Sequence, residues 1–384
     1  MNQLNAPQGT FTLNRYPLRA KDTLRAWDAA DEYILQFIAE AQASGEVFQN
    51  VLIINDSCGA LATALAPMQP VVMSDSFVSH QAIRQNLQSN RPEEAPLHLI
   101  DCLQSPADFL PTTGAPADLV ILKITKSLAQ LEDQLHRIRP LLSENTRVLA
   151  AGMVKAIHTS TLDLFGKIIG PTHTSLAKKK ARLIHCQPDL SLSPAANPFP
   201  KALPLPEHRL DIVNHASVFA RDKLDIGTRF FLENMPASDE PKHIIDLGCG
   251  NGLLGIAAAG THPNATFTMV DESFMAVASA EQNFAQNHPD RTTNFQVTDC
   301  LTGIADNCAD LILNNPPFHQ QNTIGDFIAV QMFKDAKRTL KTGGELLVIG
   351  NRHLGYHVKL KRLFGNCTTL ASNKKFVILR CIKR

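Results

Sequence analysis

Asp246-Leu247-Gly248-Cys249-Gly250-Asn251-Gly252 is the stretch that decides the fold, because it joins an apolar segment (243–245) to a helix-forming segment of small residues (253–259). Its glycines let the backbone turn tightly and approach a ligand with no Cβ in the way. A dinucleotide-binding loop of the form G-x-G-x-x-G would place its third glycine at position 253, which is Leu253. The spacing therefore predicts a strand–loop–helix unit for a ligand other than a dinucleotide.

The order acid-x-Gly-x-Gly-x-Gly resembles the first motif of class I methyltransferases. In that family the loop cradles the methionine and ribose portion of S-adenosylmethionine, a cofactor with no pyrophosphate. The resemblance assigns four residues of the loop to cofactor binding: Asp246, Gly248, Gly250 and Gly252.

Two more acids stand where this fold would need them. Asp271 ends a predicted strand (266–270) and would accept both ribose hydroxyls, and Asp299 ends the next (294–298) and would accept from the adenine amine. Alone, either acid is more typical of an ordinary turn, but in register with the glycine loop both are predicted cofactor ligands. Upstream, Phe219 would cover the adenosine and Gly227 would meet the cofactor carboxylate, although plain packing explains these two equally well.

The tetrapeptide Asn315-Pro316-Pro317-Phe318 follows a third predicted strand (311–313) and matches the fourth motif of methyltransferases that act on exocyclic or amide nitrogens. The Asn315 side-chain oxygen and the Pro316 carbonyl can each accept one N–H of a guanine amine, which points the nitrogen at the sulfonium methyl. Phe318 can stack on the base. Asn-Pro-Pro is also an ordinary turn, and the same tetrapeptide serves adenine N6 and protein glutamine, so those alternatives stay open here.

The two halves of the chain resemble each other, which indicates a duplication. The first half repeats the strand and loop of the second half at 51–59. Between the halves, residues 187–206 hold six prolines, which favour extended conformation over helix or central strand. We therefore predict a degenerate domain at 1–190, a linker at 191–206 and a catalytic domain at 207–384. Short apolar strands alternating with helices predict that both are α/β domains, tandem class I (Rossmann-like) methyltransferase folds.

The first half departs from the catalytic pattern at each decisive place. Only Gly59 remains of the loop glycines, and Lys123-Ile124-Thr125-Lys126 stands where the second half has the tetrapeptide. A lysine cannot accept the hydrogens of an amine. We predict a noncatalytic copy that binds RNA or supports its partner. Its predicted phosphate contacts are Lys123, Lys126, Lys178, Lys179, Lys180 and Arg182.

The net charge of +1 hides an uneven distribution: residues 334–384 contain 13 Lys or Arg against two acids. A basic end of this size suggests a polyanionic partner, because Lys and Arg release counterions when they contact phosphates. A solvated basic face is the alternative. Neither the eight cysteines nor the histidines show metal-ligand spacing, so we expect no metal. No apolar run approaches a membrane span and no secretory signal is visible, which predicts a cytoplasmic protein.

Taken together, the duplicated halves resemble the RlmG-type family of large-subunit ribosomal RNA guanine-N2 methyltransferases, with the small-subunit RsmC family next. The likeness is also carried by the segments 27–33, 315–321, 350–354 and 364–369. The family implies S-adenosylmethionine as cofactor, 23S rRNA as substrate, N2-methylguanosine as product, and a monomer. A 16S rRNA guanine-N2 methyltransferase is one alternative. The other is a noncatalytic RNA-binding or ribosome-assembly protein, which the intact motifs of the second half disfavour.

Overall fold

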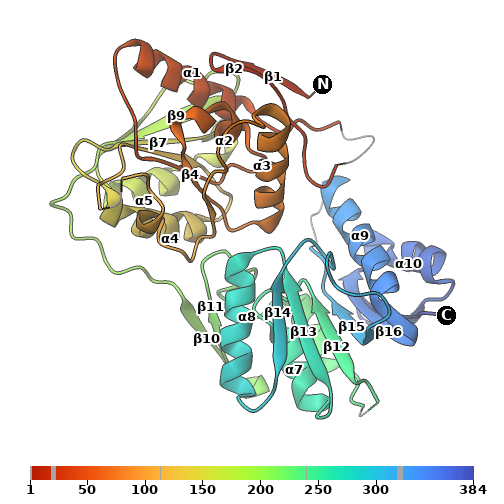
Figure 1. Ribbon diagram of the computed structural model, residues 1–384. Coiled ribbons are helices and arrows are strands. Elements are labelled where there is room, and N and C mark those ends of the chain that lie inside the picture. The colour runs from red at the N-terminus through yellow and green to blue at the C-terminus, as the bar shows by residue number, and fades with distance from the viewer. Residues whose placement is uncertain (1, 19–22, 113, 239, 318–322) are drawn as a thin grey trace. The chain divides into compact units, whose positions relative to one another are not determined.

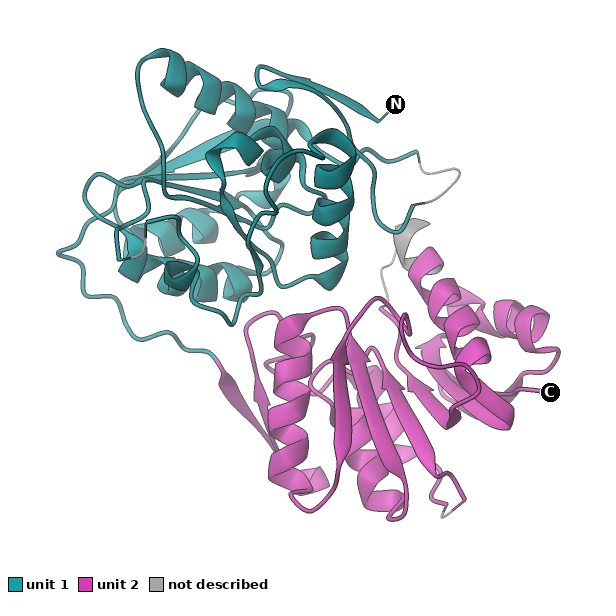
Figure 2. Cartoon of the chain, in the orientation of Figure 1, with its two compact units in different colours: residues 1–199 teal, residues 200–384 magenta. Residues whose placement is uncertain are grey.

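The chain forms two compact units (Figure 2), described by a computed structural model over residues 2–18, 23–112, 114–238, 240–317 and 323–384. Unit 1 is Met1–Phe199 and unit 2 is Pro200–Arg384. Each unit contains a seven-stranded sheet with helices packed on it (Figure 1). The expected α/β fold of two tandem Rossmann-like domains is confirmed.

The sheet of unit 2 has the strand order β14-β13-β12-β15-β16-β18-β17. The strands are β12 (His243–Leu247), β13 (Thr266–Asp271), β14 (Thr293–Val297), β15 (Ala309–Asn314), β16 (Leu340–Asn351), β17 (Thr368–Ser372) and β18 (Phe376–Ile382). The first five strands in this order, from β14 through β13, β12 and β15 to β16, pair in parallel. Strand β18 lies antiparallel to both β16 and β17. Because the carboxyl ends of the parallel strands meet at one edge, that edge is the expected ligand site.

Helices cover both faces of this sheet, because successive side chains of its buried strands point to opposite faces. The helices are α6 (Ile226–Glu233), α7 (Leu253–Thr261), α8 (Phe274–Asn287), α9 (Thr323–Thr339) and α10 (Tyr356–Phe364). Phe231 of α6, Ile256 of α7 and Phe284 of α8 pack into one core cluster with Ile244. Helices α9 and α10 pack into the other cluster.

Unit 1 repeats this architecture with the strand order β5-β4-β3-β6-β7-β9-β8 and the same strand directions. Its sheet strands are β3 (Val51–Ile54), β4 (Val71–Met73), β5 (Leu99–Ile100), β6 (Leu119–Lys123), β7 (Arg147–Met153), β8 (Thr172–Thr174) and β9 (Ala181–Cys186). Its helices are α1 (Ala29–Ala43), α2 (Ala60–Ala64), α3 (Phe77–Asn90), α4 (Leu128–Ile138) and α5 (Thr159–Ile168). Strands β1 (Gln3–Ala6) and β2 (Gly9–Thr12) form a separate hairpin.

The two units can be aligned residue by residue at the site edge. Gly59 and Gly252 are the N-caps of α2 and α7, with φ of 83° and 81°. Ile54 and Leu247 stand the same number of positions before these glycines, and they pair with Leu122 and Asn314 respectively. The residues that follow, Lys123 and Asn315, therefore occupy equivalent positions.

The end of the proline-rich segment differs from the predicted linker. Lys201–Leu205 forms strand β10, which pairs antiparallel with β11 (Leu210–Asn214) in unit 2. Pro204 is tolerated because a two-stranded sheet has free edges, where a residue without an N–H breaks no ladder. The extended segment between the two sheets thus ends before residue 201 rather than at 206.

Candidate active site

The glycine loop between β12 and α7 is shaped for close approach of a ligand. Gly248, Gly250 and Gly252 all have positive φ, of 73°, 54° and 81°. A Cβ on Gly252 would lie 3.0 Å from the Cα of Ala280, so this glycine lets α7 pack closely on α8. A Cβ on Gly250 would meet no heavy atom within 4 Å. The loop is therefore close-packed on its helix side and open at Gly250.

Asp246 is the next-to-last residue of β12, just before this loop, and its carboxylate is incompletely bonded. Its Oδ2 accepts from the Gly255 N–H at 2.8 Å, but its Oδ1 has no hydrogen-bond partner among the described residues. Burial, together with the negative charge of Asp271, raises the pKa of Asp246 to about 7, although the Gly255 hydrogen bond opposes the shift. A buried oxygen without a partner fits a donor supplied by a ligand.

Asp271 ends β13 and is tied to the same loop. Its Oδ2 accepts from the Gly250 N–H at 2.9 Å and its Oδ1 from the Ser273 N–H at 3.0 Å. Burial raises the pKa of Asp271 despite these hydrogen bonds. Asp299 follows β14, lies buried, and accepts from the Gln331 amide of α9 at 3.1 Å. The structure thus places all three predicted acids at the carboxyl edge of neighbouring strands.

The tetrapeptide begins where β15 ends. Asn314 anchors it, since its Nδ2 donates to the Leu247 carbonyl at 2.8 Å. The Nδ2 of Asn315 donates to the Thr228 hydroxyl at 3.0 Å, whereas its Oδ1 is buried and has no partner in the described part of the chain. Pro316 is buried. Phe318, the predicted stacking residue, lies outside the described residues.

The two upstream candidates have different surroundings. The side chain of Phe219 is 67% exposed, so most of its surface remains available to a ligand. Gly227 lies buried in α6, where a Cβ would stand 2.9 Å from Asp225 Oδ2 and 3.2 Å from the Phe376 ring. Packing alone accounts for a glycine at this position.

Three residues at this edge were missed from the sequence: Thr228, Gln331 and Asn314. Thr228 is the third residue of α6 after its N-cap, Asp225. An Asp-x-x-Thr pattern before an apolar run is a helix-start signal that locates Thr228 but does not reveal its contact with Asn315. In the described part of the chain, no cluster of three or more His, Cys, Asp or Glu side chains is arranged to hold a metal, and no helix is long and apolar enough to span a membrane.

Residues 1–190 match the family described as RLMG N-terminal domain, and residues 209–380 match the one described as Methyltransferase small domain. Ribosomal RNA large subunit methyltransferase G of Aeromonas salmonicida is 51% identical over 97% of this chain and 97% of its own length. The Streptomyces coelicolor protein of that name is 46% identical over 99% of this chain and 100% of its own length. The chain belongs to the methyltransferase G family.

A solved structure extends the likeness of this methyltransferase G family member to the small-subunit enzymes. The T. thermophilus 16S rRNA N2 G1207 methyltransferase (RsmC), in complex with AdoMet and guanosine, has a TM-score of 0.71 and 18% identity. The match covers 100% of this chain and 97% of that chain. At this identity the likeness establishes a shared fold over the whole chain.

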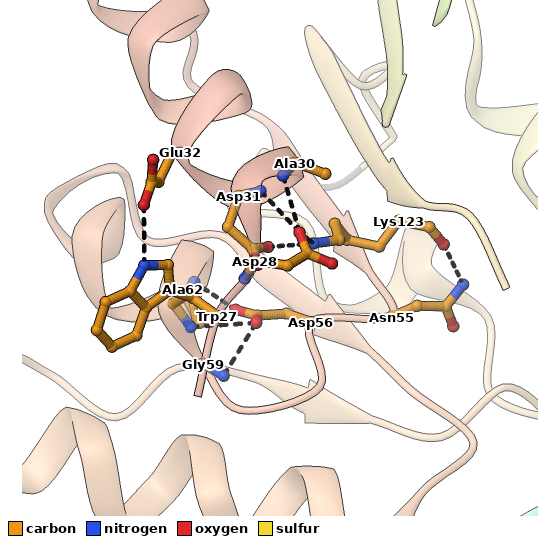
Figure 3. A network of polar contacts seen from close by, with 11 residues as sticks. Trp27, Asp28, Ala30, Asp31, Glu32, Asn55, Asp56, Gly59, Ala62 and Lys123 are labelled. Atoms are coloured by element: carbon orange, nitrogen blue, oxygen red, sulfur yellow. Dashed lines mark hydrogen bonds and ion pairs between the residues drawn. The ribbon is translucent and has the colours of Figure 1, made fainter. Parts of the chain in front are cut away.

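In unit 1 of this methyltransferase G chain, the place equivalent to the tetrapeptide is filled by an ion-pair network (Figure 3). The Lys123 ammonium lies 2.9 Å from Asp28 Oδ1 and 2.6 Å from Asp31 Oδ1, and the Lys123 side chain is only 13% exposed. Lys123 is therefore not a phosphate contact, contrary to the sequence-based expectation, because its charge is already paired and largely covered. Nearby, Asp56 accepts from the N–H groups of Gly59, Ala60 and Ala62.

The raised pKa of Asp246 predicts that the ionised carboxylate lowers the stability of the cofactor-free chain, although the cofactor needs it. The folded chain keeps a proton on Asp246 up to pH about 7 that the unfolded chain loses near its usual value of 3.8. Stability therefore falls as pH rises through this window. We expect cofactor-free Asp246→Asn to melt a few degrees above the parent at pH 8 and level with it near pH 4, while binding S-adenosylmethionine more weakly. Calorimetry checks this.

Asp310→Asn is the matched control for Asp246→Asn. Asp310 accepts from the His243 N–H and pairs with Lys341, and these contacts lower its pKa. Its neutralisation should therefore destabilise the chain at pH 8, opposite to Asp246→Asn. An Asp246→Asn variant that melts below the parent at pH 8 would contradict the assignment of Asp246 as a buried, incompletely bonded carboxylate with a raised pKa.

Proposed function

We propose that this chain transfers the methyl group of S-adenosylmethionine to the exocyclic N2 amine of one guanine in 23S rRNA, giving N2-methylguanosine. Family membership makes the chain an S-adenosylmethionine-dependent ribosomal RNA methyltransferase. One observation carries the amine chemistry: the Oδ1 of Asn315 is a buried acceptor without a partner among the described residues, beside the cofactor loop. We further propose that the enzyme acts as a monomer in the cytoplasm, where ribosomal RNA is found.

The residues of unit 2 fit the cofactor. S-adenosylmethionine supplies an electrophilic methyl group on a sulfonium. The open backbone at Gly250 admits its methionine portion, whose amino group can donate to the unpaired Oδ1 of Asp246. Asp271 would accept from the ribose hydroxyls and Asp299 from the adenine amine. Exposed Phe219 would cover the adenosine, and the Gly227 region of α6 would meet the cofactor carboxylate.

The chain's contribution to the chemistry is to orient a poor nucleophile. The lone pair of the guanine amine is delocalised into the ring, so the amine must be held in place. Asn315 Oδ1 and the Pro316 carbonyl would each accept one N–H, and both acceptors favour the positive charge that develops as the nitrogen is alkylated. The proton becomes acidic only after methyl transfer, so a strong base is unnecessary. Phe318 would stack on the extruded base.

Ribosomal RNA from a strain that lacks this chain tests the proposal. Nucleoside mass spectrometry of its 23S rRNA should show the loss of one N2-methylguanosine, and the purified chain should restore it with S-adenosylmethionine. A loss confined to 16S rRNA would support the small-subunit alternative. Intact N2-methylguanosine in both RNAs, with no transfer in vitro, would support a noncatalytic protein.

Cofactor stoichiometry follows from the difference between the two units. The position equivalent to Asn315 in unit 1 is occupied by the ion-paired, largely covered Lys123, and only Gly59 keeps the loop pattern. We expect isothermal titration to give one S-adenosylmethionine per chain, and Asp271→Ala to weaken binding by at least about tenfold, since it removes a charge-assisted acceptor. Two equivalent sites would contradict the assignment of unit 1 as a noncatalytic copy.

The β8–β9 turn of unit 1 supports an RNA-binding role for that unit. Lys179 and Lys180 both have positive φ, of 48° and 65°, between the bridged residues Lys178 and Ala181. Tight turns of this kind favour Asn and Gly. Two lysines held there at a conformational cost indicate that their exposed ammonium groups have a function. Lys179 pairs with the Glu32 carboxylate, whereas the Lys178 ammonium lies 4.7 Å from the centroid of the uncharged Tyr33 ring and keeps its charge uncompensated there. Lys178 and Lys180 are therefore the better phosphate contacts.

Charge reversal at this turn tests the role. We expect Lys178→Glu with Lys180→Glu to weaken 23S rRNA binding and to reduce the slope of log K against log salt by roughly 0.7–0.9 for each phosphate that the chain no longer binds. The matched control is Arg84→Glu with Lys167→Glu, which reverses the same charge at other exposed sites of unit 1. Equal weakening in the two double variants would show only a general charge effect and would remove the turn from the RNA site.

A further inference from the structure

The side-chain amide of Asn315 is hydrogen-bonded through its NH₂ group but not through its oxygen. Its Nδ2 donates to the Thr228 hydroxyl at 3.0 Å, and its Oδ1 has no partner within the described residues. An asparagine amide is an acceptor at one end and a donor at the other. If the amide were rotated by half a turn, it would present N–H groups to the guanine amine, which is itself a donor. The orientation of this amide therefore decides whether Asn315 can hold the amine.

Thr228 can take only one role toward Asn315 because of its other contact. Its hydroxyl lies 3.4 Å from Asp225 Oδ2, and its backbone N–H donates to the same oxygen at 2.9 Å. The single proton of the hydroxyl is given to the carboxylate, so the oxygen presents lone pairs to Asn315. Only the NH₂ end of the amide can bond to it. The acceptor is then left for the substrate.

Gly227 preserves this arrangement. A Cβ at position 227 would lie 2.9 Å from Asp225 Oδ2, the oxygen that receives both groups of Thr228. A larger residue would push the carboxylate away from Thr228. The glycine thus serves the contact between Asp225 and Thr228.

Unit 1 shows that the contact is built into the fold. Asp28 is the N-cap of α1 and Asp31 is the third residue of that helix start, just as Asp225 and Thr228 are in α6. Asp31 contacts Lys123, the equivalent of Asn315, at 2.6 Å. The same two backbone positions therefore meet in both copies. In unit 1 they form an ion pair that leaves no acceptor for an amine, whereas in unit 2 they form a neutral, directional hydrogen bond.

We propose that Thr228 is a positioning residue, which orients the Asn315 amide with its oxygen toward the guanine amine, while Asp225 sets the direction of the Thr228 hydroxyl. This inference rests on the proposed function. Thr228 does not touch the reacting atoms and acts only through Asn315. Its loss leaves a buried N–H of Asn315 without a partner, and the amide is then free to turn.

Two substitutions at position 228 of the full chain test the inference by methyl transfer to 23S rRNA from a strain lacking the enzyme. We expect Thr228→Val, which keeps the shape and removes the hydroxyl, to lower kcat by about tenfold. Without the hydroxyl the Asn315 amide can turn its N–H groups toward the guanine amine, and the acceptor is lost for part of the time. Thr228→Ser should restore kcat to within about twofold, since it keeps the hydroxyl. The affinity for S-adenosylmethionine should stay close to that of the parent, and the melting temperature of Thr228→Val should fall by no more than a few degrees.

Asn315→Asp separates orientation from general packing. A carboxylate has two equivalent acceptor oxygens, so it needs no partner to choose between its ends. The Thr228 oxygen would then face a carboxylate oxygen rather than an N–H. Adding Thr228→Val to Asn315→Asp should therefore cause no further loss of kcat, and a double-mutant cycle measures the difference. The same tenfold loss in both backgrounds would assign Thr228 to packing and overturn the inference.

Two other outcomes would also overturn the inference: a Thr228→Val chain as active as the parent, or a Thr228→Ser chain as impaired as Thr228→Val. If the proposed function is wrong, the unsubstituted chain will transfer no methyl group to ribosomal RNA. That result would overturn both the proposed function and the inference that rests on it. An active parent chain that is indifferent to Thr228→Val overturns the inference alone.

Discussion

Replacement of Asn315 by alanine is expected to lower the turnover number for methyl transfer by about 10² to 10³, by analogy with the loss of one preorganised group from an oxyanion hole. The substitution removes the unpaired Oδ1 that would accept from the guanine amine, while the Pro316 carbonyl remains. The nucleophile is then held at one N–H rather than two. Single-turnover methylation of 23S rRNA with labelled S-adenosylmethionine measures the effect.

The affinity for S-adenosylmethionine is the internal control for Asn315→Ala, because the proposed cofactor ligands Asp246 and Asp271 lie at the ends of other strands. Titration should give a dissociation constant close to that of the parent. Asn315→Asp, which keeps acceptor oxygens, should retain far more activity than Asn315→Ala. If Asn315→Ala methylates at nearly the parental rate, the tetrapeptide is only a turn after β15.

Local patterns in the sequence predicted the framework of this site well. The apolar runs and the three glycines located β12, the loop and α7, and the predicted helix-forming segment 253–259 lies within the observed helix Leu253–Thr261. These features succeed because strand, loop and helix starts depend on neighbouring residues. Asn315 was found in the same way, since its two prolines mark the end of β15.

Contacts between distant segments were not predictable in this way. Thr228 is 87 positions from Asn315, and no local pattern links a helix start to the end of a strand so far along the chain. Lys123 was misjudged for the same reason. A lysine after a strand suggests a solvent-exposed end, and its partners Asp28 and Asp31 belong to a helix more than 90 residues earlier. Strand β10 was missed because prolines disfavour central strands but not free edges.

The network in Figure 3 explains why unit 1 keeps a lysine where unit 2 has Asn315. Asp31 is 7% exposed, and burial raises its pKa even though Lys123 opposes the shift. The two acids Asp28 and Asp31 would repel each other without the ammonium between them. Lys123 therefore acts as a counterion inside the degenerate site, where it stabilises the fold of unit 1.

Lys123→Met is expected to destabilise unit 1 by about 3 kcal/mol, at the low end of the cost of removing one partner from a buried ion pair because Asp28 is half-exposed. Urea unfolding of the full chain should show an earlier transition, while cofactor binding by unit 2 is retained. The matched control is Lys179→Met, which breaks a pair with Glu32 in which the lysine is 77% exposed and should cost less than about 1 kcal/mol. The penalty of Lys123→Met should shrink as pH falls and protonation neutralises the two acids. If Lys123→Met instead left stability unchanged and weakened RNA binding, Lys123 would be a phosphate contact after all.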